Sequence, residues 1–153
     1  MDEFLQVAET VVIYKLRTAW HEISRLYNEM ASQYGGTMSM GFILLTLNDQ
    51  EGTPVTKIAP RMGMKPNSLS RVLKSMEEKG FIWRKRDEHD HRKVYICLTD
   101  LGKEMRKISF KAVFKLEESI IKDLEPEKLE TFFEVMNHVQ EVVENFSLEK
   151  ENA

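Results

Sequence analysis

Side chains suited to contact with a polyanion are concentrated between residues 65 and 93 of the 153-residue chain. Arginine pairs with phosphate or guanine through parallel N–H groups, asparagine pairs in a similar way with adenine, and serine donates to phosphate oxygens. Taken singly, such residues more often contact the backbone of a nucleic acid than its bases. The residues that we select for this site are Lys65, Asn67, Ser68, Ser70, Arg71, Lys74, Arg84, Arg86, Arg92 and Lys93, together with Asp90, an acid that precedes Arg92 by two residues.

This stretch is basic, although the chain as a whole is acidic. Residues 57–93 contain 11 Lys and Arg against 5 Asp and Glu, a net charge of +6, whereas the whole chain carries -3. A local basic patch is the electrostatic footprint that phosphate contact requires. Charge alone is equally compatible with a solvated surface. The elements that carry these residues must therefore decide between the two interpretations.

The spacing of apolar residues predicts a short helix followed by a β-hairpin. Four apolar residues fall on one side of a helix over residues 66–79, which Pro66 begins and Gly80 ends. β-like runs over residues 81–86 and 93–98 flank a charged loop, residues 87–92. A helix of this size fits the major groove of a duplex, and a basic hairpin tip reaches an adjacent minor groove.

A shorter helix over residues 57–62 is expected to precede the first one. Thr56 is its predicted N-cap, Pro60 should lie in its first turn or just past it, and Gly63 provides the turn that follows. Val55 could add a short strand to the hairpin. The pattern predicts a helix-turn-helix, because a helix and a glycine-containing turn are followed by a second helix with a polar outer face.

Longer helices are predicted on both sides of this centre. Apolar residues spaced 3 and 4 apart run from Ile13 to Tyr34 and again from Leu129 to Phe146, and they predict helices over residues 2–34 and 127–147. Such seams predict a homodimer, whose two recognition helices would lie about 34–36 Å apart on DNA. The alternative is that each seam packs only inside its own chain.

Two further helices connect the terminal ones to the centre. Thr37 is the predicted N-cap of a helix over residues 38–50, and Thr99 is the predicted N-cap of one over residues 100–124. The apolar residues of the second drift from one face to another along its length. This helix can therefore serve both the helix-turn-helix and the dimerisation layer.

Several classes of protein and of site are not favoured. The start is acidic and no apolar run approaches the roughly 18 residues needed to span a bilayer, which predicts a soluble, cytoplasmic protein without membrane contact. We find no catalytic motif and expect neither an enzyme nor a cofactor. His89 and His91 flank Asp90 but are too few ligands for a metal. Cys97 lacks a resolving cysteine, so redox sensing is not favoured.

The residues around the hairpin resemble a known signature. The stretch ending at Gly102, KGFIWRKRDEHDHRKVYICLTDLG, resembles the winged-helix signature of the MarR family of bacterial transcriptional regulators, and the preceding VTKIAPRMGMKPNSLSRVLKSMEEKG is similar to its helix-turn-helix. The signature positions are held by Arg84, Asp87, Asp90, Arg92, Leu98, Thr99 and Gly102. The resemblance implies an obligate dimer with intertwined terminal helices. It also implies that Arg92 enters a minor groove, oriented by an ion pair with Asp90.

We therefore predict a mainly α protein with a small β-hairpin wing, a winged helix-turn-helix that forms a homodimer. Residues 1–36 form the N-terminal dimerisation helix, residues 37–100 the DNA-binding domain, and residues 101–153 the helices that complete the dimerisation domain. The function predicted is a repressor that binds double-stranded DNA at a pseudo-palindromic operator. The alternative is a winged helix that binds protein without operator binding.

The resemblance also implies an effector that is a small aromatic or amphipathic molecule, and the apolar residues between the two layers fit such a ligand. Binding there would release the DNA by changing the spacing of the two recognition helices. The residues selected for the lining are Trp20, Met38, Phe42 and Met105. The alternative is a fully packed junction that binds no ligand.

Overall fold

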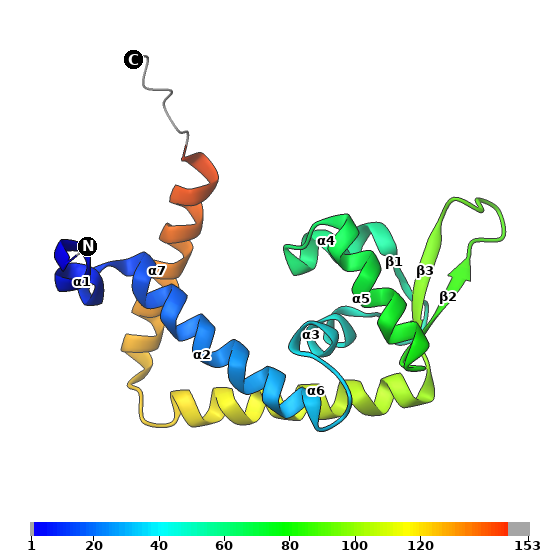
Figure 1. Ribbon diagram of the computed structural model, residues 1–153, viewed down its shortest axis with the longest axis horizontal. Helices are drawn as coiled ribbons and strands as arrows, with labels where there is room; N and C mark the ends of the chain where they lie inside the picture. Colours follow the sequence, from blue (N-terminus) through cyan, green and yellow to red (C-terminus); the bar gives the residue numbers. More distant parts are fainter. Residues whose placement is uncertain (1, 147–153) are drawn as a thin grey trace, which may run out of the picture. The chain divides into compact units, whose positions relative to one another are not determined.

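A computed structural model of the chain describes residues 2–146, which are mainly helical with one small sheet (Figure 1). The elements in chain order are α1 (Asp2–Val7), the 3-10 helix η1 (Ala8–Thr10), α2 (Val12–Ser32), α3 (Met38–Thr46), β1 (Thr53–Pro54), α4 (Val55–Met62), α5 (Pro66–Glu78), β2 (Ile82–Arg86), β3 (Val94–Leu98), α6 (Asp100–Ile121) and α7 (Pro126–Asn145). None of the described helices is both long and apolar enough to cross a bilayer.

The core lies where α3, α4 and α5 pack together with the sheet. Its fully buried side chains include Ile43, Leu44, Leu47, Ile58, Leu69, Leu73, Met76, Ile82 and Ile96. Burying each side chain of this size stabilises the fold by about 1.5–3 kcal/mol. The apolar face predicted for residues 66–79 is thus directed inward, which leaves the opposite face of α5 to solvent.

The predicted hairpin and its register are confirmed. β3 lies in the centre of a three-stranded antiparallel sheet with the order β1-β3-β2, and its pairing with β2 runs from Ile82 opposite Leu98 to Arg86 opposite Val94. The third strand, β1, is formed by Thr53 and Pro54, so our assignment of Val55 to this strand was wrong. Val55 instead begins α4 directly.

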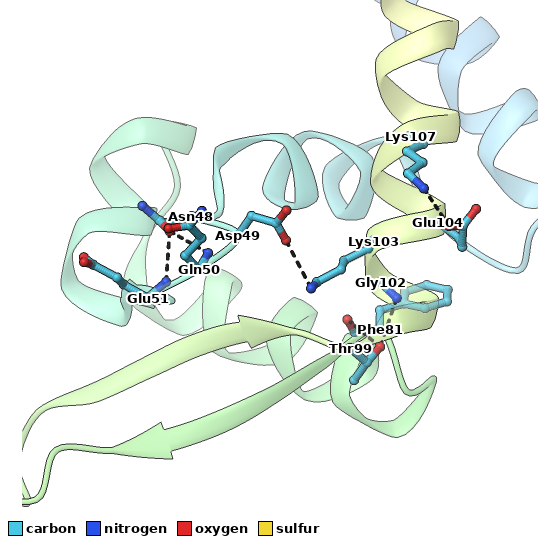
Figure 2. A network of polar contacts seen from close by, with 10 residues as sticks. All are labelled: Asn48, Asp49, Gln50, Glu51, Phe81, Thr99, Gly102, Lys103, Glu104 and Lys107. Carbon is cyan, nitrogen blue, oxygen red and sulfur yellow. Dashed lines mark hydrogen bonds and ion pairs between the residues drawn. The ribbon is translucent and has the colours of Figure 1, made fainter.

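A hydrogen-bonded junction joins the end of α5, the base of the hairpin and the start of α6 (Figure 2). The hydroxyl of Thr99 lies 2.5 Å from the carbonyl oxygen of Gly80 and 3.1 Å from that of Phe81. It also accepts a hydrogen bond from the backbone N–H of Gly102 at 2.9 Å, which confirms the predicted N-cap. One side chain thereby fixes three elements to one another.

The turn at the end of α5 has the geometry that a glycine permits. Gly80 has φ +72° and donates its N–H to the carbonyl of Glu77, while Phe81 donates to the carbonyl of Met76. These two bonds form a Schellman motif, which satisfies carbonyls at the helix end. The predicted helix end at Gly80 is thus confirmed.

The single N-terminal helix predicted over residues 2–34 is wrong, because the structure breaks it. Val11 is extended, with φ −86° and ψ +119°, and it separates η1 from α2. Residues 10–13 are β-branched without exception, and such side chains lose rotamer freedom inside a helix. The apolar seam begins only at Ile13, after this break, and no Pro or Gly marks residues 2–12, which is why the sequence did not reveal it.

Two predicted helix boundaries near the centre also need correction. The helix predicted over residues 38–50 begins after its predicted cap, Thr37, but ends at Thr46. The chain turns there because the side chain of Asn48 accepts hydrogen bonds from the N–H groups of Gln50 and Glu51 (Figure 2). Thr56 is not a cap, because α4 starts at Val55.

Pro60 lies inside α4 just past its first turn, which agrees with the prediction. The N–H that proline lacks would have bonded to the carbonyl of Thr56, in the first turn of the helix. α4 therefore loses one hydrogen bond near its start and continues to Met62. Gly63 follows with φ +59° and provides the predicted turn.

The last two helices match the predicted positions more closely. α6 ends at Ile121 instead of Leu124, and α7 begins at Pro126, one residue before the predicted start. Ser147, the last residue predicted for that helix, lies outside the described residues. The described chain divides into two compact units between Ala112 and Val113, so α6 contributes to both.

We predict that replacing Gly102 by alanine destabilises the protein by about 1–3 kcal/mol, the usual cost of overpacking. A Cβ atom at Gly102 would lie 1.9 Å from the carbonyl oxygen of Phe81, so the base of the hairpin must move. Denaturant titration of Gly102→Ala measures the change. Gly36→Ala is the control, because the nearest atom to its Cβ is 3.6 Å away. Equal unfolding free energies for the two variants would contradict the junction as described.

Candidate nucleic-acid interface

The outer face of α5 consists of polar and basic side chains that are exposed. The inward face is held by Leu69, Leu73 and Met76, and Pro66 occupies the first turn, where its missing N–H has no partner to lose. The predicted contact residues of this helix and its N-cap are all exposed, namely Lys65, Asn67, Ser68, Ser70, Arg71 and Lys74. The structure therefore brings these six residues to one accessible surface.

The hairpin carries a second group of exposed cations. Arg84 and Arg86 alternate along β2, and Lys93 directly precedes β3. The hairpin leaves the C-terminal end of α5, and its tip extends away from the helices of the core (Figure 1). Polar residues of α5 and of the hairpin are thus presented by two neighbouring elements of one compact unit.

The tip of the hairpin is ordered by Asp87. One carboxylate oxygen of Asp87 accepts hydrogen bonds from the N–H groups of Asp90 and His89, both at 2.9 Å. These bonds hold the pKa of Asp87 below its ordinary value. The resulting stabilisation of the tip is present above the ordinary carboxyl pKa and is lost as the pH falls through the lowered pKa.

Asp90 orients Arg92, as the family resemblance implied. The carboxylate of Asp90 is half-buried and accepts from both the backbone N–H of Arg92, at 3.2 Å, and its side-chain Nε, at 3.3 Å. The side chain of Arg92 is 94% exposed. The ion pair is confirmed, and it leaves the terminal nitrogens of the guanidinium free for another acceptor.

Three of the predicted cations have a carboxylate partner. Arg92 pairs with Asp90, Lys74 with Glu78 at 3.9 Å, and Arg84 with Glu77 at 3.2 Å. The remaining ones, Lys65, Arg71, Arg86 and Lys93, have no carboxylate within 4.0 Å in the part of the chain that the structure describes. Their positive charge is available to an external anion, and a helix-sized surface lined by such charges suits a nucleic-acid phosphate backbone.

Sequence reasoning missed the roles of Glu77 and Asp87 as partners. Glu77 lies one turn after the buried Leu73 and so borders the inward face of α5. Asp87 precedes two residues that could donate to it, which is the local signal of an aspartate turn. Both signals were present in the sequence, but only the three-dimensional pairing distinguishes them from solvated carboxylates.

The residues selected for an effector site lie on α2, α3 and α6. The rings of Trp20 and Phe42 are 6.5 Å apart, and Phe42 also contacts Tyr27 edge to face at 5.8 Å. Met105 packs against the core, while Trp20 remains half exposed. A separate surface pocket follows α6 from Asp100 to Lys111 and includes none of the four selected residues.

Cys97 is partly buried on the central strand. Burial raises the pKa of its thiol, which disfavours the reactive thiolate form at neutral pH. The backbone at Gly52 lies against it, so close that a Cβ atom there would be 2.6 Å from the sulfur. These surroundings are those of a packed side chain.

Comparison with known sequences matches the centre of the chain. The sequence model of the MarR family covers residues 37–94. The HTH-type transcriptional regulator SarZ of Staphylococcus epidermidis is 30% identical over 87 residues, 57% of this chain and 59% of SarZ. MgrA of Staphylococcus aureus, also named an HTH-type transcriptional regulator, is 31% identical over 94 residues, 61% of this chain and 64% of MgrA. The chain thus spans about three fifths of the length of these curated relatives.

Comparison with solved structures extends the likeness in fold. The S. aureus MepR–DNA complex superimposes with a TM-score of 0.80 at 22% identity, covering 86% of this chain and 97% of MepR. PcaV of Streptomyces coelicolor, solved with its natural ligand, gives a TM-score of 0.73 at 18% identity, covering 88% and 95%. The fold is therefore a winged helix-turn-helix with flanking helices. Over residues 37–94 the chain is similar to the MarR family, and over most of its length it shares the fold of these solved structures.

Proposed function

We propose that this protein is a homodimeric, sequence-specific DNA-binding regulator of transcription that acts as a repressor. The observation that carries the proposal is the pair of exposed elements in one compact unit, the polar outer face of α5 and the hairpin tip that presents Arg92. The names of SarZ and MgrA as HTH-type transcriptional regulators, and the DNA in the MepR structure, support it.

In this proposal α5 enters the major groove and the wing enters an adjacent minor groove. Asn67 and Arg71 are the side chains with the donors and acceptors to read base edges, while Lys65, Ser68, Ser70, Lys74, Arg86 and Lys93 contact the phosphate backbone. Asp90 contacts no DNA and instead orients Arg92. A guanidinium suits a narrow minor groove, because the negative potential there is concentrated.

A winged helix that binds only protein is the second candidate, and it is less well supported. Such a use would favour an apolar outer face on α5, since the centre of a protein interface is depleted of charged residues. The outer face instead carries exposed Asn67, Arg71 and Lys74. An enzyme is not supported, because the family and the relatives found are regulators.

Dimerisation is proposed from apolar side chains that a single chain leaves exposed. Ile13 on α2 is 61% exposed, Val143 on α7 is 64% exposed, and Phe132 and Phe133 form an exposed edge-to-face pair. Exposed seams of this length are unfavourable in a monomer. We propose residues 1–36 and 101–153 as the dimerisation parts and residues 37–100 as the DNA-binding part.

The effector is proposed to be a small aromatic or amphipathic molecule that binds beside Trp20, Met38, Phe42 and Met105. The ligand-bound PcaV structure supports an effector for this fold. Such a ligand acts only through its different affinity for the DNA-competent and incompetent spacings of the two recognition helices. A coupling of about 1.4 kcal/mol changes DNA affinity tenfold.

Replacing Arg92 by alanine should weaken DNA binding by about 1–3 kcal/mol and leave the fold intact, because an exposed guanidinium is lost. The probe is the fragment that the protein retains most strongly from its source genome, titrated at fixed salt. Lys128→Ala, which removes an exposed cation from the start of α7, is the control and should bind normally. Unchanged affinity in Arg92→Ala would remove this residue from the interface.

The protein should be a dimer at micromolar concentration, as measured by light scattering. Removing residues 127–153 should abolish tight DNA binding, although none of our proposed DNA contacts is deleted, because the two reading units lose their common frame. A stable monomer of the full chain, or a truncated chain with native affinity, would contradict the dimer.

Aromatic carboxylates and phenols should include compounds that release the protein from its DNA fragment. We expect Trp20→Ala or Met38→Ala to reduce this response, with circular dichroism confirming that each variant is folded. Titration of the compounds against the protein–DNA complex measures the release. The effector site is refuted if no compound shifts DNA affinity and both variants behave as the native chain.

A further inference from the structure

Arg84 and Glu77 form a contact whose purpose the DNA-binding proposal does not explain. Nε of Arg84, on β2, lies 3.2 Å from Oε2 of Glu77, on α5. Among residues 2–146 this is the only side-chain hydrogen bond or ion pair that joins α5 to the hairpin. We had predicted Arg84 as a DNA-binding residue.

The position of the pair follows from the alternation of β2. Ile82 is fully buried in the core, and Arg84, two residues later, shares its face of the strand. On α5, Glu77 lies one turn after the buried Leu73. The pair therefore lies at the rim of the apolar contact between α5 and the sheet, where the hairpin begins to extend into solvent.

The other restraints on the hairpin are concentrated at its base. Its base is fixed by Thr99 and Gly102, and Ile82 packs in the core, but Lys85 and Arg86 are exposed. Gly80, in the connection to α5, is itself held by the Schellman bonds and by Thr99, so bending of the hairpin must arise beyond Ile82. An ion pair beyond the last buried residue of β2 is well placed to limit this bending.

We propose that Glu77 and Arg84 are positioning residues that hold the wing at a fixed angle to the recognition helix α5. This inference rests on the proposed DNA-binding function and refines it. Arg84 is paired with Glu77 and its side chain is far less exposed than that of Arg92 or Lys74, so its guanidinium is less accessible to a phosphate. The pair acts on DNA through Arg92, whose entry into a minor groove depends on the direction of the hairpin.

The expected effect is modest, because the side chains of Arg84 and Glu77 are 36% and 43% exposed. Ion pairs of this kind contribute little, so breaking the pair should weaken DNA binding by roughly two- to fivefold. The direction of the change in DNA affinity is more informative than its size. If Arg84 contacted phosphate, removing the charge of Glu77 would strengthen binding, whereas a positioning role makes the same change weaken it.

The experiment compares Glu77→Gln with Glu78→Gln in the full chain, using the DNA fragment retained from the source genome. Glu78 is the matched control, because it has the same charge on the same helix but pairs with Lys74 instead of the hairpin. Glu77→Gln should bind more weakly than Glu78→Gln. The charge-exchanged chain with Glu77→Arg and Arg84→Glu should recover most of the native affinity.

Salt dependence separates the two roles of Arg84. Loss of a phosphate contact makes the negative slope of log K against log salt shallower by about 0.9, whereas loss of a positioning pair leaves the slope unchanged. Arg84→Ala should therefore weaken binding without changing the slope. Equal affinities for Glu77→Gln and Glu78→Gln, or a shallower slope for Arg84→Ala than for the native chain, would overturn the inference.

A measurement on the free protein keeps this inference distinguishable from the DNA-binding proposal. Amide hydrogen exchange at Lys85 and Arg86 should be faster in Glu77→Gln than in Glu78→Gln, since the outer half of β2 loses its restraint. Exchange that is identical in the two variants would refute the restraint itself. A native protein that retains no DNA would instead refute the proposed function.

Discussion

The hydrogen bonds of Thr99 are the interaction on which the rest of the structure depends. Its hydroxyl contacts the carbonyls that follow α5 and the N–H of Gly102 in the first turn of α6, so one residue joins the reading helix, the hairpin and the longest helix (Figure 2). Gly102 makes this possible, because any side chain there would occupy the position of the Phe81 carbonyl. Neighbouring Lys103 adds an ion pair to Asp49, which extends the junction toward the loop after α3.

This junction explains how exposed residues on α5 and on the hairpin can act as one interface. α5 and the base of the hairpin share a core, so the outer face of α5 and the base of the hairpin move as one body. The tip adds its own order through Asp87 and Asp90, which bind backbone N–H groups around the loop. Pre-ordering of this kind reduces the entropy that binding must otherwise offset.

The parts of the fold that could be predicted from the sequence are those with local causes. Pro66, Gly80 and Thr99 fix boundaries through backbone chemistry, and the alternation of Val94, Ile96 and Leu98 sets the face of the strand, so the centre of the chain was predicted within a residue or two. The break at Val11 was missed because no Pro or Gly marks it, and the rotamer cost of consecutive β-branched residues is a weaker signal. The end of α3 was misplaced because a side-chain turn at Asn48 competed with helix propensity.

The candidate site was predictable as a set of exposed residues but not as a set of roles. Spacing on α5 is enough to place Asn67 and Arg71 outward, whereas the partner of Arg84 lies seven residues away in sequence, on another element.

DNA binding by a two-fold dimer is tested by hydroxyl-radical footprinting of the protein on its retained DNA fragment. A dimer that reads DNA with two α5 helices should protect two half-sites related by two-fold symmetry, with centres about 34–36 Å apart. Protection of a single half-site, or none at concentrations that retain the fragment, would contradict it.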